Sequence, residues 1–432
     1  MRPGASAVGY FSCWSPGANS RAWWCTLGVE FSDFFVPFLE DIMNVRSPFS
    51  RRQFVGGVAA AVGALSLRPE ADLLAQGQTA QFTGGDAEYD AFIKLASNEN
   101  NYGPPPSVMK AMTDAFKYAN RYGYPDGNIV QVIADHHGVK RDNVLLTAGS
   151  GEGLDVVATT YLGPGKKVLG VSPSYASVFQ QAANVKADAI QIPLTKDYRQ
   201  NISAMIETTN RHAREIGFVY MCNPNNPTGA IVTAKEIKDL LDNIPKDMPV
   251  LIDEAYHHFV NDPAYGTAIP YVLEGRPVIV ARTFSKIAAL AAMRIGYSIA
   301  PADMVREMNV YASNSVNVLA KWGAVASLKD KAAEADVKAK IVDMRDKTTK
   351  VLESYGYPVI PSQANFFMVS LGERQVQGVI EEFRKMGILV GRPFPPMLNH
   401  LRVSVGTADD MEKFMAAFKK IFPQKTATAT RG

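Results

Sequence analysis

From about residue 90, the chain alternates apolar runs with amphipathic helical stretches. Several of these runs are continuously hydrophobic, which is typical of strands that are buried on both faces. Repeated strand–helix units of this kind predict a mostly parallel, doubly wound α/β sheet. The predicted strands cover residues 143–147, 167–172, 217–222, 249–253, 277–283 and 295–300, and the predicted helices between them include 153–161 and 234–241.

The pattern changes after about residue 311. A long helical region with polar faces, at about 324–355, precedes two short strand candidates at 365–370 and 401–405. This order indicates a smaller α+β domain behind the large one, and a chain of 432 residues is longer than one ordinary core requires. We therefore expect an N-terminal arm at 76–125, a large domain at 126–310, a small C-terminal domain at 311–425 and a tail at 426–432.

The N-terminal segment differs from the rest of the chain. Residues 1–42 hold three of the four tryptophans and two of the three cysteines, without a sustained helical or strand period. We interpret them as an extension outside the fold, with Met43 as a candidate start, and a genuine N-terminal tail is the alternative. The cysteine spacing suits neither a zinc site nor a disulfide framework.

A twin-arginine pattern follows. Arg51 and Arg52 precede a mild, Ala/Gly-rich apolar stretch at 54–67 that is too short to span a membrane. Together they resemble a Tat export signal at 43–75, although a basic patch before a small helix is the alternative. We expect an exported, periplasmic or secreted protein, or otherwise a cytoplasmic one. The formal net charge of +3 gives no reason to expect a nucleic-acid or membrane partner beyond the export machinery.

Reactive side chains follow one predicted strand. Ligands of α/β sheets bind at the carboxyl ends of strands, and Thr283, Ser285 and Lys286 stand at such an end, with Arg294 further on. A lysine whose pKa is lowered by desolvation can condense with an aldehyde. Hydroxyl groups and an arginine suit the binding of a phosphate. A lone lysine is usually solvated surface, but this context favours a Schiff base beside a phosphate site.

Two further strand ends carry polar residues. Asp253 ends a predicted strand and Tyr256 follows it. A carboxylate there can hold a protonated pyridine nitrogen and keep the ring an electron sink, and the tyrosine can reach a phenolic oxygen of the ring. The alternative is a helix N-cap aspartate. The Asn/Pro-rich turn at 223–229 either adds Asn226 to the same oxygen or is only a turn.

A glycine-rich loop connects the first predicted strand to a helix. It carries Ser150, Gly151 and Glu152, and its backbone N–H groups and helix dipole can bind a phosphate. Its spacing does not fit a dinucleotide-binding loop. Tyr175, after another strand, either stacks on a flat cofactor ring or packs in the core. We expect no metal site, because the paired histidines lack a suitable carboxylate spacing.

These motifs together resemble the class I/II aminotransferase family and, within it, the histidinol-phosphate aminotransferase branch. The resemblance implies a pyridoxal 5'-phosphate (PLP)-dependent transferase of fold type I, with an amino acid and a 2-oxo acid as substrates. It also implies a homodimer with shared active sites. It covers about residues 90–415 and is carried by residues 95–104, 124–127, 225–229, 253–256, 285–286 and 401–407.

The resemblance also implies a role for each matched residue. Lys286 would hold PLP as a Schiff base and move the proton, Asp253 would bind the pyridine nitrogen, and Tyr256 would complete the catalytic set. The other cofactor-binding residues would be Ser150, Gly151, Glu152, Tyr175, Asn226, Thr283, Ser285, Arg294 and, from the partner subunit, Tyr124. Substrate-binding residues would be Arg402 for the α-carboxylate, Tyr102 covering the neighbouring site, Asn365 and Arg392.

Departures from the branch leave the substrate open. Gly151 stands where the branch usually has an acidic residue, and the stretch at 287–293 is rich in alanine. The donor is therefore expected to be an amino acid or an amino-acid-derived amine such as histidinol phosphate. One alternative is other PLP chemistry on this fold, as in a decarboxylase, lyase or oxidase. Another is an exported solute-binding protein, which would not need Lys286, Asp253 and Arg294 together at strand ends.

Overall fold

The computed structural model describes residues 85–425. The expected extension at 1–42, the export signal at 43–75 and the tail at 426–432 lie outside these residues. Among the helices of the described region, none is long and apolar enough to cross a membrane.

A seven-stranded sheet forms the centre, in the order β2-β8-β7-β6-β5-β3-β4. β8 runs antiparallel to both of its neighbours, and the other pairs are parallel. The predicted mostly parallel α/β sheet is therefore confirmed. Its strands are β2 (Val144–Thr147), β3 (Lys167–Ser172), β4 (Asp188–Pro193), β5 (Ile216–Cys222), β6 (Val250–Asp253), β7 (Val278–Thr283) and β8 (Gly296–Ile299).

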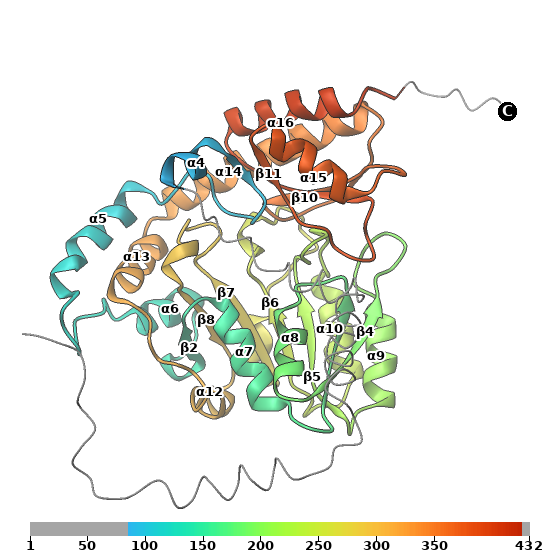
Figure 1. Cartoon of the computed structure of the whole chain (residues 1–432). Helices are drawn as coiled ribbons and strands as arrows, with labels where there is room; N and C mark the ends of the chain where they lie inside the picture. The colour runs from blue at the N-terminus through green and yellow to red at the C-terminus, as the bar shows by residue number, and fades with distance from the viewer. Residues whose placement is uncertain (1–84, 426–432) are drawn as a thin grey trace, which may run out of the picture. The chain divides into compact units, whose positions relative to one another are not determined.

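Helices cover both faces of this sheet, as the continuous apolar strands predict (Figure 1). One face packs against apolar side chains of α7 (Ser150–Tyr161), α8 (Ser177–Asn184) and α12 (Ala302–Asn309). The opposite face packs against the apolar sides of α6 (Ile129–His137), α9 (Ile202–Arg211) and α10 (Ala234–Asn243).

A second, three-stranded antiparallel sheet has the order β12-β10-β9. The first short strand of the described region, β1 (Ile93–Leu95), pairs in parallel with β11 (Ile388–Val390), so the N-terminal arm and the C-terminal part share backbone hydrogen bonds. The three strands are β9 (Val359–Ile360), β10 (Phe366–Ser370) and β12 (His400–Ser404), with α15 (Val376–Lys385) and α16 (Ala408–Ile421).

The helical region predicted at about 324–355 is two helices, α13 (Val318–Lys329) and α14 (Lys331–Ser354). The break occurs at Asp330, whose carboxylate accepts a 3.0 Å hydrogen bond from the backbone N–H of Ala333 and so begins a new helix. Shorter elements are α4 (Asp86–Ala91), α5 (Pro106–Ala115) and α11 (Ile269–Leu273), and the 3-10 turns Phe116–Tyr118, Arg141–Asn143, His257–Phe259 and Ala291–Met293.

Candidate active site

Lys286 follows β7 at the carboxyl edge of the large sheet. Its Nζ donates a 3.1 Å hydrogen bond to the carbonyl oxygen of Ser97 and lies 5.6 Å from the ring centroid of Tyr256. Burial, and next the positive charge of Arg402, lower the pKa of Lys286 to about 8. A substantial share of the amine is therefore neutral near physiological pH, which is the form that attacks an aldehyde.

Asp253 ends β6, directly beside β7. Its carboxylate is buried and accepts a 3.1 Å hydrogen bond from the backbone N–H of Ala255. Burial raises the pKa of Asp253 to about 6. A buried carboxylate with a raised pKa is poorly stabilised in its ionised form, and a nearby positive charge stabilises that form. A protonated pyridine nitrogen is a partner of that kind.

Tyr256 is buried next to this pair. Its hydroxyl oxygen accepts hydrogen bonds from Nδ2 of Asn98 at 3.2 Å and from Nδ2 of Asn226 at 3.4 Å. Its ring packs edge-to-face on Phe366, with 5.0 Å between the centroids. Burial raises the pKa of Tyr256, so the phenol is neutral and keeps a proton that it can donate.

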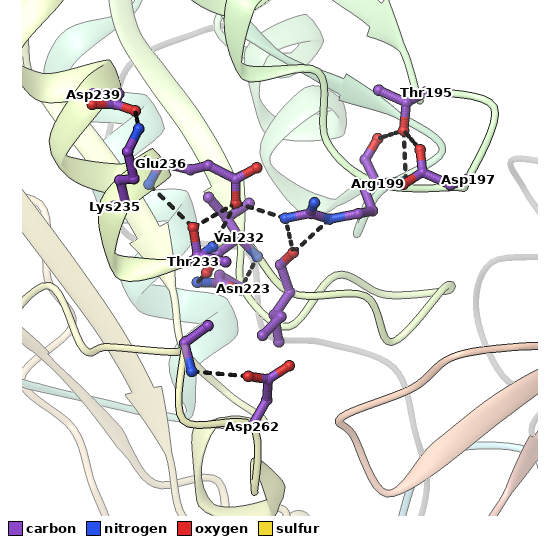
Figure 2. A network of polar contacts seen from close by, with 12 residues as sticks. Thr195, Asp197, Arg199, Asn223, Val232, Thr233, Lys235, Glu236, Asp239 and Asp262 are labelled. Atoms are coloured by element: carbon purple, nitrogen blue, oxygen red, sulfur yellow. Dashed lines mark hydrogen bonds and ion pairs between the residues drawn. The ribbon is translucent and has the colours of Figure 1, made fainter.

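The turn that carries Asn226 is held by a polar network behind it, which Figure 2 shows. Asn223 exchanges two 2.9 Å hydrogen bonds with the backbone of Val232, one from its amide and one to it. Thr233 and Glu236 then form a capping box that begins α10. Nη2 of Arg199 donates at 2.6 Å to the same carboxylate oxygen of Glu236 that accepts from Thr233. The amide of Asn226 is therefore presented from a fixed turn.

A buried ion pair fixes the strand ends themselves. Glu254, directly after Asp253, lies 2.6 Å from the guanidinium of Arg282, which directly precedes Thr283. Both side chains are at most 5% exposed, and Thr267 donates to the same carboxylate at 2.8 Å. The pair joins β6 to β7 and so fixes the spacing of Asp253 and Thr283.

The glycine-rich loop lies under an arginine. Gly149 has φ +84°, a backbone conformation that glycine adopts without strain, and a Cβ atom there would displace the guanidinium of Arg294. Arg294 donates to the carbonyl oxygens of Ala291 at 3.0 Å and Ala148 at 3.4 Å. Ser150 begins α7 at this point. An arginine over the N-terminus of a helix suits a phosphate group.

Two hydroxyl groups lie at the end of β7. Thr283 Oγ1 donates to Ser285 Oγ at 2.8 Å and accepts from the backbone N–H of Ser285 at 3.1 Å. Both side chains are buried, and they precede Lys286 in the chain. Because β2 and β7 both pair with β8, these hydroxyls and the glycine loop belong to neighbouring parts of the same sheet edge.

Three other predicted cofactor residues have distinct places. Gly151 lies in the first turn of α7. The carboxylate of Glu152 accepts hydrogen bonds from the backbone N–H groups of Ala148 and Ser313, the latter at 2.7 Å, and thus braces the loop. Tyr175 is 40% exposed. Partial burial, and next the charge of Asp253, raise the pKa of Tyr175.

Arg402 is a buried cation in β12. Its Nη1 donates to Oδ1 of Asn226 at 2.8 Å, its Nη2 donates to the carbonyl oxygen of Ala96, and its Nε has no partner among the described residues. Burial lowers the pKa of Arg402 to about 10, so the group stays charged at neutral pH. An unpaired Nε–H on a buried guanidinium suits an incoming carboxylate.

Arg392 lies over the same aromatic ring as Arg402. The guanidinium carbons of Arg392 and Arg402 are 4.4 Å and 4.6 Å from the ring centroid of Phe394. Nη1 of Arg392 also donates to the carbonyl oxygen of Pro393 at 2.9 Å. Asn365, in contrast, is turned to the N-terminal arm: its Nδ2 donates to the carbonyl oxygen of Asn98 at 3.0 Å, and its buried Oδ1 is without a partner in the described region.

Two predicted tyrosines are not part of this network. The hydroxyl of Tyr124 donates to the carbonyl oxygen of Val316 at 2.9 Å. The ring of Tyr102 lies under Lys340, whose Nζ is 5.4 Å from the ring centroid. Their predicted contacts are with a neighbouring subunit, so they stay predictions.

Asn98 and Ser404 were not among the predicted site residues, although Asn98 is buried beside Tyr256 and Ser404 is buried beside Asn98. The sequence contained one signal for Asn98, because it lies in the motif at 95–104, and asparagine tolerates the left-handed backbone found there. Ser404 likewise lies in the motif at 401–407, but a serine at the end of a strand is common and does not by itself indicate a role.

The partly buried amine of Lys286, the buried carboxylate of Asp253 and the arginine-covered glycine loop fit an aldehyde, a pyridine ring and a phosphate respectively. These are the three parts of PLP. The fold and the site together define a PLP-dependent enzyme of fold type I.

Comparison with known proteins gives the family. The model of the family "Aminotransferase class I and II" matches residues 90–418. The chain is 36% identical to histidinol-phosphate aminotransferase of Moorella thermoacetica over 76% of this chain and 85% of that protein. It is 34% identical to an aromatic amino acid aminotransferase of Rhodococcus jostii over 75% of this chain and 88% of that protein. The chain therefore belongs to the class I and II aminotransferase family.

A solved structure shows the same fold. Histidinol-phosphate aminotransferase of Sinorhizobium meliloti, crystallised in complex with pyridoxal-5'-phosphate, has a TM-score of 0.72, with 23% identity over 80% of this chain and 96% of that chain. Aminotransferases of this family use PLP to exchange an amino group between amino and oxo acids. This chain is a PLP-dependent aminotransferase.

Proposed function

We propose that Lys286 is the residue to which PLP is covalently attached and the group that moves the proton at the substrate α-carbon. The observation that carries this proposal is the pairing of neighbouring strand ends, with the partly buried amine of Lys286 after β7 and the buried Asp253 at the end of β6. PLP, when bound, supplies an electron sink for the negative charge that develops at the α-carbon. Side chains of this protein bind and orient the cofactor and the substrate and move the proton.

The remaining cofactor residues hold and orient the ring. Asp253 pairs with the ring nitrogen, and Tyr256 and Asn226 bind the phenolic oxygen, while Tyr175 stacks on one face. The phosphate is held by groups that meet at the carboxyl edge of the sheet, where the helix dipole adds to the charge of an arginine. These groups are Ser150, Gly151, Thr283, Ser285 and Arg294, and Glu152 braces the loop through its hydrogen bonds from Ala148 and Ser313.

The two arginines over Phe394 support a substrate class. Arg402 binds the α-carboxylate of an amino acid donor, and Arg392 faces a second anionic group. Next to them, Phe394, Met368 and Met397 form an apolar cluster. A pocket with a cationic rim and an apolar wall suits a donor that combines a flat or apolar body with an anionic group. Glutamate, with a side-chain carboxylate besides its α-carboxylate, can engage both arginines, and histidinol phosphate, which has a phosphate and no α-carboxylate, combines a flat body with an anionic group.

A panel of amino donors tests this substrate class. Histidinol phosphate, glutamate and phenylalanine are compared on the wild-type protein and on Arg392→Gln. kcat/KM is expected to fall for histidinol phosphate and glutamate, which have an anionic group other than an α-carboxylate, and to stay unchanged for phenylalanine. Arg374→Gln, which removes an exposed arginine that pairs with Glu382, is the control. An unchanged order of donors in Arg392→Gln contradicts the proposal.

The same assay separates transamination from the alternative PLP reactions. A transaminase produces one 2-oxo acid for each amino group transferred, whereas a decarboxylase releases CO2. An oxidase consumes O2. Formation of the oxo acid without CO2 release or O2 consumption is the expected result.

We also propose that the active unit is a homodimer in which Tyr124 reaches the partner's cofactor phosphate and Tyr102 covers the partner's substrate. Large apolar side chains are exposed on the elements next to Tyr124. Phe116 is 60% exposed and Tyr122 is fully exposed. Exposed apolar groups that gather in one part of a surface are typical of an interface.

Finally, we propose that the protein is exported by the Tat route. Arg51 and Arg52 and the mild apolar stretch behind them support this proposal. The Tat system transports folded proteins, so an enzyme that binds its cofactor in the cytoplasm suits it.

A further inference from the structure

Asn98 is a buried amide that none of the roles above uses. We infer that Asn98 is a positioning residue: held by Ser404, it directs the only proton of the Tyr256 hydroxyl toward the cofactor. This inference rests on the proposed role of Tyr256 at the phenolic oxygen of PLP.

The first step is that the orientation of the Asn98 amide is fixed. The backbone N–H of Asn98 donates to Ser404 Oγ at 2.8 Å, and the hydroxyl of Ser404 donates to Oδ1 of Asn98 at 3.0 Å. The amide oxygen of Asn98 faces Ser404, whose hydroxyl donates its one proton to it. The NH2 group must then point the other way, and there it meets the Tyr256 hydroxyl at 3.2 Å.

The second step concerns the hydroxyl of Tyr256. A phenol oxygen has one proton and can accept two hydrogen bonds. Asn98 supplies one donor and Asn226 supplies the other, at 3.2 Å and 3.4 Å. Both amide groups are donors toward the oxygen, so neither can receive its proton. The O–H of Tyr256 is left to donate to a third group, and the phenolic oxygen of the ring is the acceptor that the proposed function provides.

The third step is that the backbone holds Asn98 in place. Asn98 has φ +54°, in the left-handed region that asparagine adopts more readily than most residues. Its carbonyl oxygen accepts a 3.0 Å hydrogen bond from Nδ2 of Asn365. Ser404 lies in β12 on the same face as Arg402, two residues away, since alternate residues of a strand share a face. β12, which carries Arg402, therefore also carries Ser404, the residue that orients the Asn98 amide toward Tyr256.

The chemical consequence has a defined direction. Burial raises the pKa of Tyr256, and the charge of Arg402 and then the hydrogen bond from Asn98 lower it. A more acidic phenol is a stronger donor. Stronger donation stabilises the anionic form of the ring oxygen. Loss of Asn98 should therefore raise the pH at which the visible absorption band of the enzyme-bound cofactor titrates. Loss of one neutral hydrogen bond to the ring oxygen, as in Tyr256→Phe, is worth about half to one pH unit, and the shift from loss of Asn98, which acts through Tyr256, should be a fraction of that.

The test is a spectrophotometric pH titration of the PLP-loaded protein. Asn98→Gly removes the amide and accepts a positive φ without strain, and Ser404→Ala removes the group that orients the amide. Both variants should titrate at a higher pH than the wild type. Asn101→Ala is the matched control: it removes another bond from the N-terminal arm, to Asp410 at 3.0 Å, without touching Tyr256. It should titrate as the wild type does.

The Tyr256→Phe background completes the experiment. Tyr256→Phe alone should shift the titration upward, and adding Asn98→Gly should then change nothing further. If Tyr256→Phe does not shift the titration, the proposed role of Tyr256 fails. If Tyr256→Phe shifts it but Asn98→Gly and Ser404→Ala do not, or if Asn98→Gly adds its full shift in the Phe background, the inference about Asn98 is overturned while the proposed function stands.

Discussion

Arg402 donates a 2.8 Å hydrogen bond from Nη1 to Oδ1 of Asn226. The other end of the same amide donates to the hydroxyl of Tyr256 at 3.4 Å. One asparagine side chain therefore connects the cation proposed to bind substrate with the phenol proposed to bind the cofactor.

This link leads to a prediction for Arg402→Lys. Lysine keeps the positive charge but loses the planar fork that binds a carboxylate through two N–H groups. kcat/KM should fall roughly tenfold to a hundredfold for every amino acid donor alike, since charge-assisted hydrogen bonds contribute about 1.5–3 kcal/mol. The measurement is a steady-state donor panel, with Arg374→Lys as the surface control. A reordering of donors with an unchanged general rate would show that Arg402 and Arg392 have been given each other's roles.

Asp253→Asn should have opposite effects on activity and on stability. Activity should fall severely, because an uncharged amide no longer stabilises a protonated ring nitrogen. The folded-state pKa of Asp253 is raised to about 6, so ionising this buried group costs folding free energy as the pH rises from about 4 through 6. Above pH 6 the cofactor-free variant should be more stable than the wild type, by roughly 2–3 kcal/mol.

Two measurements check this prediction: turnover of the loaded enzyme, and urea unfolding of the cofactor-free protein at pH 5 and pH 7.5. The stability gain should be larger at pH 7.5. Activity within a factor of two of the wild type would mean that Asp253 is not the partner of the ring nitrogen.

Assembly gives a third prediction. If Tyr124 and Tyr102 act across an interface, the active species is at least a dimer, and activity depends on assembly. Phe116→Glu places a charge among the exposed apolar side chains and should dissociate the dimer and reduce activity together. Analytical ultracentrifugation at the assay concentration checks this. A monomer with full activity would exclude shared active sites.

Export gives a fourth prediction. Changing Arg51 and Arg52 to lysine should leave the protein in the cytoplasm, folded and loaded with PLP. The arginine pair is read by a receptor, so an equal charge should not replace it. Cell fractionation with an absorbance measurement of bound PLP checks the outcome, and unchanged recovery from the periplasm would rule out this signal.

The large sheet and the site at its edge were predictable because buried parallel strands and the residues after them leave a strong signal. The predicted strand at 167–172 agrees with β3 in both bounds, and Asp253 and Thr283 end β6 and β7 as expected. A run of apolar residues that ends in a polar one locates the carboxyl edge of a sheet directly. The polar residues that meet there could therefore be named in advance.

Other features depend on contacts between distant parts of the chain. β4 was not predicted, because it is an edge strand whose mostly exposed residues include charged and polar ones. The pairing of β1 with β11 joins segments almost 300 residues apart, and three-residue strands carry no periodic signal. The reciprocal hydrogen bonds between Asn98 and Ser404 likewise join segments that are far apart in the chain. Each residue alone is an ordinary polar residue of a loop or strand.

Lys286 carries the central claim and gives the fifth prediction. Lys286→Ala should abolish the covalent attachment of PLP and reduce turnover by at least the 10²–10⁴-fold that proton transfer typically contributes. Because the pKa of Lys286 is lowered to about 8, the rate at which cofactor-free wild-type protein takes up PLP should rise with pH through about 8. A variant that keeps both the visible spectrum and the rate of the wild type would contradict this role.

The most direct measurement is to reduce the PLP-loaded protein with borohydride, digest it and locate the modified lysine by mass spectrometry. The structure predicts one pyridoxyl adduct per chain, on the peptide that contains Lys286. An adduct on a different lysine, with Lys286 unmodified, would contradict the account.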